Sequence, residues 1–370
     1  MAQSIQKMWD FYNLKPNAPL YMKEFGYYSL ARWQREGHLP QGDAQAQAAL
    51  TQLCGFDGPA VHQLGELGWC EAAFVPPFPE KVLEDRGAYE LVQDFAGRGV
   101  LVFKGRRNGF MPEYATHPVG NLADFQRHVA WRLDPQAEGR FATLEPRMRA
   151  ARAAAGQGQV IQQNLIGGYM YLRSLIGPLE LLYAFHDQPE LIHAAMEAWF
   201  RLADAVIARH QEFVEIDELF MAEDICYNHG PLISPGMMRA FLFPYYQQLI
   251  ANIKRRQGRP FHIQIDTDGF CEPVIPLYME LGMDVMSPFE AAAGCDLLRV
   301  AERYPQLRLS GGMDKMALAQ GREAIDRMVN RLLPPLCRRG GFLPTCDHGV
   351  PEEVSFANYL HFRQRLREFA

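Results

Sequence analysis

The sequence contains none of the short motifs that usually identify a hydrolase, a zinc protease or a nucleotide-binding protein. It has no Gly-x-Ser-x-Gly turn, no His-Glu-x-x-His helix, no Walker loop and no complete Gly-x-Gly-x-x-Gly. The seven cysteines include no Cys-x-x-Cys pair, and their odd number and wide spacing are typical of reduced thiols. The function must therefore be sought in the arrangement of the fold.

The chain also lacks an excess of basic charge, a long apolar run and a leader-like start. Its 37 Lys and Arg against 43 Asp and Glu give a formal net charge of -6, which argues against nucleic-acid binding. No stretch of about 18 consecutive apolar residues occurs, and no basic segment followed by an apolar core opens the sequence. We therefore expect a cytoplasmic protein with no membrane partner.

From about residue 160 onward, short apolar runs alternate with longer segments whose apolar residues recur at helical spacing. That alternation is typical of repeated strand and helix units around a parallel sheet. One helix start is marked by Ser234 followed by Pro235, which resembles an N-cap and a first turn. The expected strands cover residues 160–167, 218–226, 261–269, 283–290, 307–314 and 342–349.

The first half is less regular. Residues 19–28 and 68–78 are predicted to form the first two strands, whereas residues 99–114 are predicted to form a hairpin or an insertion. Because 48% of the residues are hydrophobic and no linker divides the chain, we expect one domain over residues 1–370.

Polar side chains stand at the carboxyl ends of successive predicted strands. In a (β/α)8 barrel these ends meet at one mouth, where several strands contribute catalytic residues. The sequence therefore predicts an α/β protein, a single (β/α)8 TIM barrel with an irregular N-terminal extension and an acidic site. The residues concerned are Glu223, Asp224, Asp266, Asp268, Glu290, Asp314, Asp347 and His348.

Asp266 and Asp268 form the most informative pair. Side chains two apart on a strand point the same way, so the two carboxylates are expected to converge before Gly269. Such a pair either binds a ligand between its members or raises the pKa of one carboxyl, which suits general acid catalysis. A plainer alternative is that both carboxylates bind loop amides and substrate without a metal.

Several segments together resemble one known family. They are GPLELLYAF (177–185), the stretch 222–246, DTDG (266–269), SPFEAAAGCD (287–296), LSGGMDK (309–315) and the closing GGFLPTCDHGVPEEVSFANY (340–359). These segments are similar to the uroporphyrinogen decarboxylase superfamily. That superfamily includes the decarboxylase of haem biosynthesis and barrel methyltransferases that exchange methyl groups with corrinoid proteins.

The resemblance has two departures. Decarboxylases of the family carry an arginine motif near the first strand, but residues 19–33 here contain Lys23 and Glu24 and no arginine before Arg32. The methyltransferases use a His-x-Cys-Gly turn and a later cysteine to bind zinc. Here the turn at 266–269 is Asp-Thr-Asp-Gly, and the later position is His348.

The resemblance implies three alternative functions. The favoured one is a methyltransferase that moves a methyl group between a small molecule and a corrinoid on a separate carrier protein, because the arginine motif is missing. The second is decarboxylation of uroporphyrinogen or a related carboxylated tetrapyrrole. The third is a non-catalytic, tetrapyrrole-binding barrel. A homodimeric assembly is left open.

The resemblance and the strand ends together assign roles to individual residues. A divalent metal such as zinc would be held by Asp266, Asp268 and His348, with Cys346 replacing or joining them. Catalytic roles are expected for Asp266, Asp268, Glu223 and Asp224. The alternative for Glu223 and Asp224 is to cap the following helix or to pair with Arg239.

Substrate contacts are expected from the loops and from aromatic residues near the start of the barrel. Their alternatives are ordinary loop packing, a structural salt bridge for Glu290, and core packing for the aromatic side chains. The residues expected to bind substrate are Tyr27, Phe78, Tyr227, His229 and Glu290.

Overall fold

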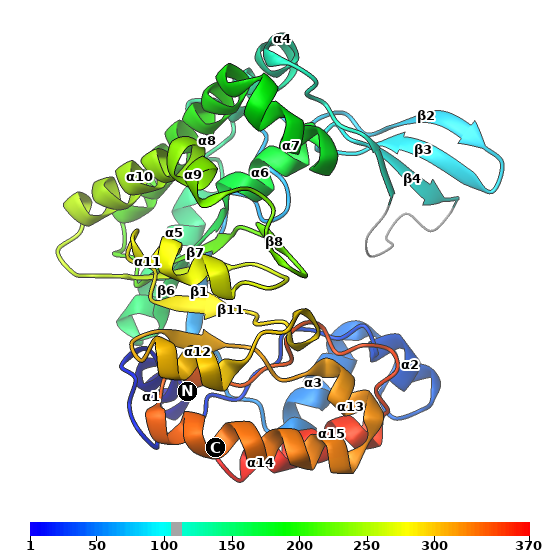
Figure 1. The fold of residues 1–370 in the computed structure, drawn as a ribbon, viewed down its shortest axis with the longest axis vertical. Coiled ribbons are helices and arrows are strands. Elements are labelled where there is room, and N and C mark those ends of the chain that lie inside the picture. The colour runs from blue at the N-terminus through cyan, green and yellow to red at the C-terminus, as the bar shows by residue number, and fades with distance from the viewer. Residues whose placement is uncertain (105–112) are drawn as a thin grey trace.

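The computed structural model describes residues 1–104 and 113–370, with a curled parallel sheet of seven strands at its centre. Helices cover this sheet on two sides, with α8 and α10 on one and α12 to α15 on the other (Figure 1). The strand order is β1-β6-β7-β10-β11-β12-β13. The bounds are β1 Val61–Leu64, β6 Val160–Ile166, β7 Glu218–Ala222, β10 His262–Asp266, β11 Val285–Ser287, β12 Arg308–Ser310 and β13 Phe342–Leu343.

The helices connect these strands and return the chain to the same end of the sheet. The α-helices are α1 Ala2–Tyr12, α2 Leu30–Arg35, α3 Asp43–Cys54, α4 Leu122–Asp124, α5 Leu144–Gly156, α6 Gly168–Ile176, α7 Pro178–Asp187, α8 Pro189–Gln211, α9 Pro235–Met237, α10 Phe243–Arg256, α11 Ile275–Met279, α12 Leu297–Arg303, α13 Lys315–Gln320, α14 Arg322–Arg339 and α15 Phe356–Arg367. Short π or 3-10 helices are η1 Phe125–Val129, η2 Ala130–Leu133, η3 Met238–Leu242, η4 Glu272–Val274 and η5 Ala291–Ala293.

The strands predicted after residue 160 are confirmed, although each is shorter than expected. Every residue of β7 is buried, which explains the apolar run over residues 219–222, because a parallel sheet covered by helices has no exposed face. Ser234 is confirmed as an N-cap, since its hydroxyl oxygen accepts a hydrogen bond from the Met237 amide. The mixed α/β class with a parallel sheet is therefore confirmed.

The two strands predicted in the first half are wrong. Residues 68–78 form loops and bends, and the strand of this region is β1, Val61–Leu64. Residues 19–28 contribute only an isolated bridge between Tyr27 and Val350, so the described residues do not form the eighth strand of a closed barrel. Prolines explain the first error, because a Pro-rich segment cannot supply the amide donors of a central strand.

The predicted insertion is present as a four-stranded antiparallel sheet that projects from the main body (Figure 1). Its strands are β2 Lys81–Arg86, β3 Tyr89–Gln93, β4 Gly99–Phe103 and β5 Glu113–Thr116. Strands β4 and β5 pair antiparallel, as the hairpin over residues 99–114 predicts, and the part from 105 to 112 lies outside the described residues. A short hairpin, β8 Cys226–Tyr227 and β9 Gly230–Pro231, follows β7.

The inside of the curled sheet is polar. Gln63, Gln162 and Gln264 line a cavity of about 170 Å³ together with Lys23 and Ser310. A polar interior of this kind costs free energy unless its groups find partners, and here Gln63 Nε2 donates to Gln162 Oε1 at 3.0 Å and Gln264 Nε2 donates to the Ser287 hydroxyl at 2.7 Å.

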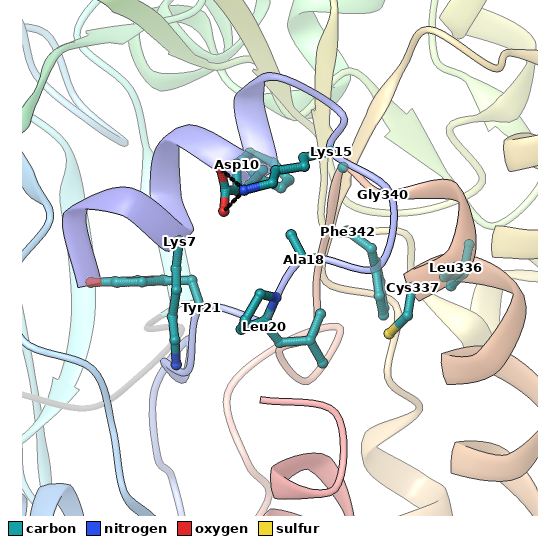
Figure 2. Close-up of a pocket in the computed structure, with 13 residues that line it drawn as sticks. Lys7, Asp10, Lys15, Ala18, Leu20, Tyr21, Leu336, Cys337, Gly340 and Phe342 are labelled. Carbon is teal, nitrogen blue, oxygen red and sulfur yellow. Dashed lines mark hydrogen bonds and ion pairs between the residues drawn. The ribbon is translucent and has the colours of Figure 1, made fainter. Parts of the chain in front are cut away.

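A separate crevice lies beside the start of β13, between the N-terminal segment and α14 (Figure 2). Lys15 and Asp10 form an ion pair of 3.1 Å at its edge. With about 20 Å³, the crevice has room for about one water molecule and none for a substrate.

Within the described ranges, none of the helices combines the length and apolar character that a membrane crossing requires.

Candidate active site

Asp266, the last residue of β10, lies at the centre of the candidate site. Its carboxylate accepts a hydrogen bond from the Ser287 hydroxyl on the neighbouring strand, and that hydroxyl oxygen accepts one from Gln264 Nε2 at 2.7 Å. Burial raises the pKa of the Asp266 carboxyl to about 7, although the Ser287 bond lowers it. Asp268 and Asp224 raise this pKa further by repulsion. Asp266 therefore exchanges a proton close to neutral pH.

Asp268 and His348 face each other beside Asp266. His348 Nε2 lies 3.6 Å from Asp268 Oδ2, and the Gly349 amide donates to His348 Nδ1 at 2.9 Å. Because Nδ1 accepts this bond, a neutral His348 carries its proton on Nε2, toward Asp268. The contact with Asp268 raises the pKa of His348 despite its burial. The structure thus brings together two expected acids and the expected histidine.

Asp224 supplies a third carboxylate, already held by a cation. Arg173 Nη2 on α6 donates to Asp224 Oδ2 at 2.6 Å, and the Asp268 amide lies 3.4 Å from Asp224 Oδ1. The residue adopts a left-handed backbone with φ 46°, which Asp tolerates better than most residues. The Asp224 amide also donates to the Asp266 carbonyl at 3.2 Å, so the ends of β7 and β10 are joined.

Glu223 points in a different direction from its neighbour Asp224. Its Oε1 accepts hydrogen bonds of 2.7 Å from both Tyr246 on α10 and Tyr278 on α11, and the residue is fully buried. Burial raises the pKa of Glu223 to about 7. Glu223 therefore ties two outer helices to the end of β7, away from Asp266, and this geometry does not support the catalytic role predicted for it. Arg239, the alternative partner of these acids, pairs with Glu280.

We expect the Tyr246→Phe change to lower the free energy of unfolding by about 1–3 kcal/mol. The change removes one donor to Glu223 and also leaves the Gly168 amide, which donates to the Tyr246 hydroxyl oxygen, without its acceptor. The measurement is urea unfolding followed by circular dichroism. Tyr245→Phe on the same helix is the matched control, because Tyr245 bonds His193 in an exposed contact, and a change within about 0.5 kcal/mol is expected there. Equal losses in both variants would contradict this interpretation.

The loops around the acidic turn are held together by a second network. The Gly269 amide donates to Glu290 Oε2 at 2.8 Å, and Lys315 Nζ lies 3.3 Å from Glu290 Oε1 and 3.5 Å from Asp347 Oδ1. Glu290 therefore binds the turn itself. Glu290 thus forms the salt bridge that the structural alternative predicts, and it also lies beside the candidate site.

Tyr227 and His229 lie in the β8–β9 hairpin next to the same turn. The Phe270 amide donates to the Tyr227 carbonyl at 2.9 Å, and the Tyr227 and His229 rings contact each other edge to face at 5.6 Å. The Tyr227 side chain is about half exposed at 48%. The position of Tyr227 and His229 beside the turn permits contact with a substrate, and that role stays a prediction.

Three predicted residues lie elsewhere. Tyr27 bonds Tyr359 through the two hydroxyl groups at 2.9 Å and packs against Trp33. Phe78 lies under the guanidinium of Arg132, 4.1 Å from the ring centre, near the inserted sheet. For these two residues the structure shows ordinary packing contacts and no contact with Asp266.

Cys346 is the third. Its side chain is fully buried, burial raises the pKa of its thiol, and its amide donates to Glu24 at 2.9 Å. In residues 1–104 and 113–370, no three His, Cys, Asp or Glu side chains are grouped as ligands for one ion. The described residues therefore show no preformed set of ligands for the predicted zinc ion, and the buried, packed thiol of Cys346 does not join Asp266, Asp268 and His348; metal binding stays a prediction.

Sequence reasoning missed four residues of the site: Ser287, Lys23, Arg173 and Lys315. Ser287 was inside a predicted strand, but its pairing with Asp266 depends on the strand register. Lys23 lies within the curl, where burial lowers its pKa while the negative charge of Asp266 opposes that shift. A charged residue in the apolar segment PLYM-K-EF was the signal that could have indicated it.

Comparisons with known proteins agree with this architecture. The match to the uroporphyrinogen decarboxylase (URO-D) family model covers residues 100–369. A uroporphyrinogen decarboxylase of Geobacter metallireducens is 25% identical over 176 residues, which is 46% of this chain and 49% of that protein, so the match spans about half of the relative's length. A methyltransferase from Methanosarcina mazei superposes with a TM-score of 0.59 over 99% of this chain and 98% of its own, and at 14% identity this likeness concerns the fold alone. By its family match over most of its length, and by its curled parallel sheet, the chain belongs to the uroporphyrinogen decarboxylase family.

Proposed function

We propose that this protein transfers a methyl group between a small uncharged molecule and a corrinoid held by a partner protein, with Asp266 as the general acid. The observation that carries the proposal is the Asp266 carboxyl, which stands half-buried at the end of β10 among other acids and whose pKa desolvation raises to about 7. A carboxyl with this pKa is protonated in about half of the molecules at neutral pH, and in that form it can give its proton to a leaving group.

The charges around Asp266 favour an uncharged substrate. Arg173 is occupied by Asp224, and Lys315 by Glu290 and Asp347. Among the described residues around Asp266, the other basic groups are Lys23, whose charge Asp266 favours, and His348, which Asp268 holds. A porphyrinogen with many carboxylates requires several unoccupied cations, so this set supports a small neutral substrate better.

In the proposed step a methoxy C–O bond breaks and its electron pair stays on the oxygen. Asp266 gives its proton to that oxygen, which leaves as a hydroxyl group. The methyl group passes to the nucleophilic corrinoid that the partner carries. In the reverse direction the proton returns to Asp266. Ser287 stabilises the carboxylate form and so lowers the pKa of Asp266, which affects the rate in both directions.

The test is incubation of the purified protein with methoxylated compounds and chemically reduced cobalamin as a stand-in for the carrier. We expect methylcobalamin, detected by its absorbance, and the demethylated alcohol in equal amounts. The matched assay is uroporphyrinogen turnover, followed by chromatography of the oxidised porphyrins. Loss of carboxyl groups from uroporphyrinogen without any methyl transfer would contradict the proposal.

The second candidate is decarboxylation, and the family match and the Geobacter relative favour it. The same protonated Asp266 would then deliver its proton to a carbon atom, and the C–CO₂ bond would break with its electron pair retained by the substrate. Lys23, inside the curl next to Asp266, would hold one carboxylate of such a substrate.

A further inference from the structure

A second hollow lies at the ends of β1 and β6, where the loop after β1 forms one wall. Its volume is about 490 Å³, within the usual range of small-molecule sites. Aromatic rings form much of its wall, and Trp69 stacks on Phe220 of β7 with 5.0 Å between ring centres and 11° between planes. The lining includes Glu66, Trp69, Glu71, Phe74, Phe95 and Asn164.

The loop that forms one wall of the hollow also feels the charge of Asp224. Cys70, next to Trp69, has a thiol whose pKa is raised to about 11, mainly by burial and then by the carboxylates of Glu71 and Asp224. Asp224 in turn lies close to the Asp268 amide, so the loop of residues 65–74, which supplies much of the lining, comes near the acidic turn.

The charges of the wall are already neutralised. Glu71 Oε1 lies 2.7 Å from Arg98 Nη2, and Glu66 binds both Arg147 and His210, the latter at 2.9 Å. An aromatic cage for a cation normally offers an unpaired carboxylate or several unobstructed ring faces. Here the carboxylates are occupied, so the rings favour a neutral ligand.

Asn164 provides the remaining polar group. It stands on β6 beside Phe220, and its Oδ1 is buried without a hydrogen-bond partner among the described residues. An unpaired buried amide oxygen costs free energy, which a small rotation of the amide toward a ligand would recover. A hydroxyl group matches either end of the amide, because it both donates and accepts.

We propose that this hollow binds a neutral aromatic ring that carries a hydroxyl or alkoxy group, stacked on Trp69 and bonded to Asn164. The inference deepens the proposed function, on which it rests, by naming aromatic ethers and phenols as the substrate class. Ring stacking, worth about fivefold in affinity, would separate such ligands from aliphatic alcohols, and a hydrogen bond of similar size would separate them from unsubstituted rings such as toluene.

The test is equilibrium binding of phenol, toluene, cyclohexanol and tetramethylammonium to the whole protein by calorimetry and ligand-observed NMR. We expect phenol to bind at least about fivefold more tightly than cyclohexanol and than tetramethylammonium. Trp69→Ala should weaken phenol about tenfold. Trp131→Ala is the matched control, because Trp131 is an equally exposed tryptophan in a different hollow, and no change is expected there.

The Asn164→Leu variant separates the hydrogen bond from the stacking. It should lower phenol affinity to the level of toluene and leave toluene itself unchanged. Equal phenol binding in the Trp69→Ala and Trp131→Ala proteins would overturn the inference, as would tighter binding of tetramethylammonium than of phenol. Because these measurements involve no turnover, phenol binding without methyl transfer would contradict only the proposed function. Methyl transfer from an aliphatic ether without phenol binding would contradict only this inference.

Discussion

Replacing Asp266 by Asn is expected to lower the rate of methyl transfer by about 10²- to 10⁴-fold, the usual contribution of a general acid. Asn has nearly the same shape, so packing against Ser287 is retained while the transferable proton is lost. The measurement is kcat with a methoxylated substrate at pH 6.5. A variant with unchanged kcat would show that Asp266 is not the acid.

The pH dependence of the methyl-transfer rate tests the same role of Asp266. The active form of Asp266 is protonated, so the rate in the acid-dependent direction should fall as the pH rises through about 7. The Ser287→Ala change removes a hydrogen bond that favours the carboxylate, and therefore raises the pKa of Asp266. The falling limb should move to higher pH in this variant. A shift to lower pH would contradict the assigned role of Ser287.

The Arg363→Met change is expected to cost about 3–5 kcal/mol of the free energy of unfolding, because it leaves a buried carboxylate without its cation. Arg363 Nη1 lies 3.5 Å from Glu24 Oε2, and the two side chains are only 1% and 2% exposed. Burial raises the pKa of Glu24, and Arg363 is the largest influence that lowers it. Urea unfolding at pH 7.5 measures the loss.

The double change Glu24→Gln with Arg363→Met is the control. It removes both charges, so a substantial part of the stability should return. The deficit of the single variant should also shrink as the pH falls toward about 4.5. The folded-state pKa of Glu24 is raised, and the penalty for its charge therefore develops only above the pKa of the unfolded chain. Equal losses in the single and double variants would contradict this account.

The second half of the fold was predictable because buried parallel strands appear as short apolar runs between helical segments. The first half was not. Val61–Leu64 reads VHQL, with only two apolar residues, and the segment 68–78 is apolar but contains adjacent prolines. Residues 19–28 lie beside the sheet, where the Asp57 amide donates to the Met22 carbonyl at 2.8 Å, but form no regular ladder.

The site was predictable where chemistry follows a strand end, as for Asp266, Asp268 and His348. The sequence pattern could not show that the adjacent acids Glu223 and Asp224 point in different directions. Asp224 meets Arg173 and the Asp268 amide, whereas Glu223 turns to Tyr246 and Tyr278; both residues follow the end of β7, and the left-handed backbone of Asp224 is not visible in the sequence. Ser287 and Lys23 required the register and the position of the N-terminal segment, which only the tertiary structure provides.

The most direct test of the central claim is the protonation state of Asp266, measured by infrared difference spectroscopy between the protein at pH 6 and at pH 9. A protonated carboxyl gives a C=O band that a carboxylate lacks, and the Asp266→Asn protein identifies the band by its absence. We predict a carboxyl that titrates near pH 7 and disappears in the variant. A carboxylate already fully ionised at pH 6 would contradict the account.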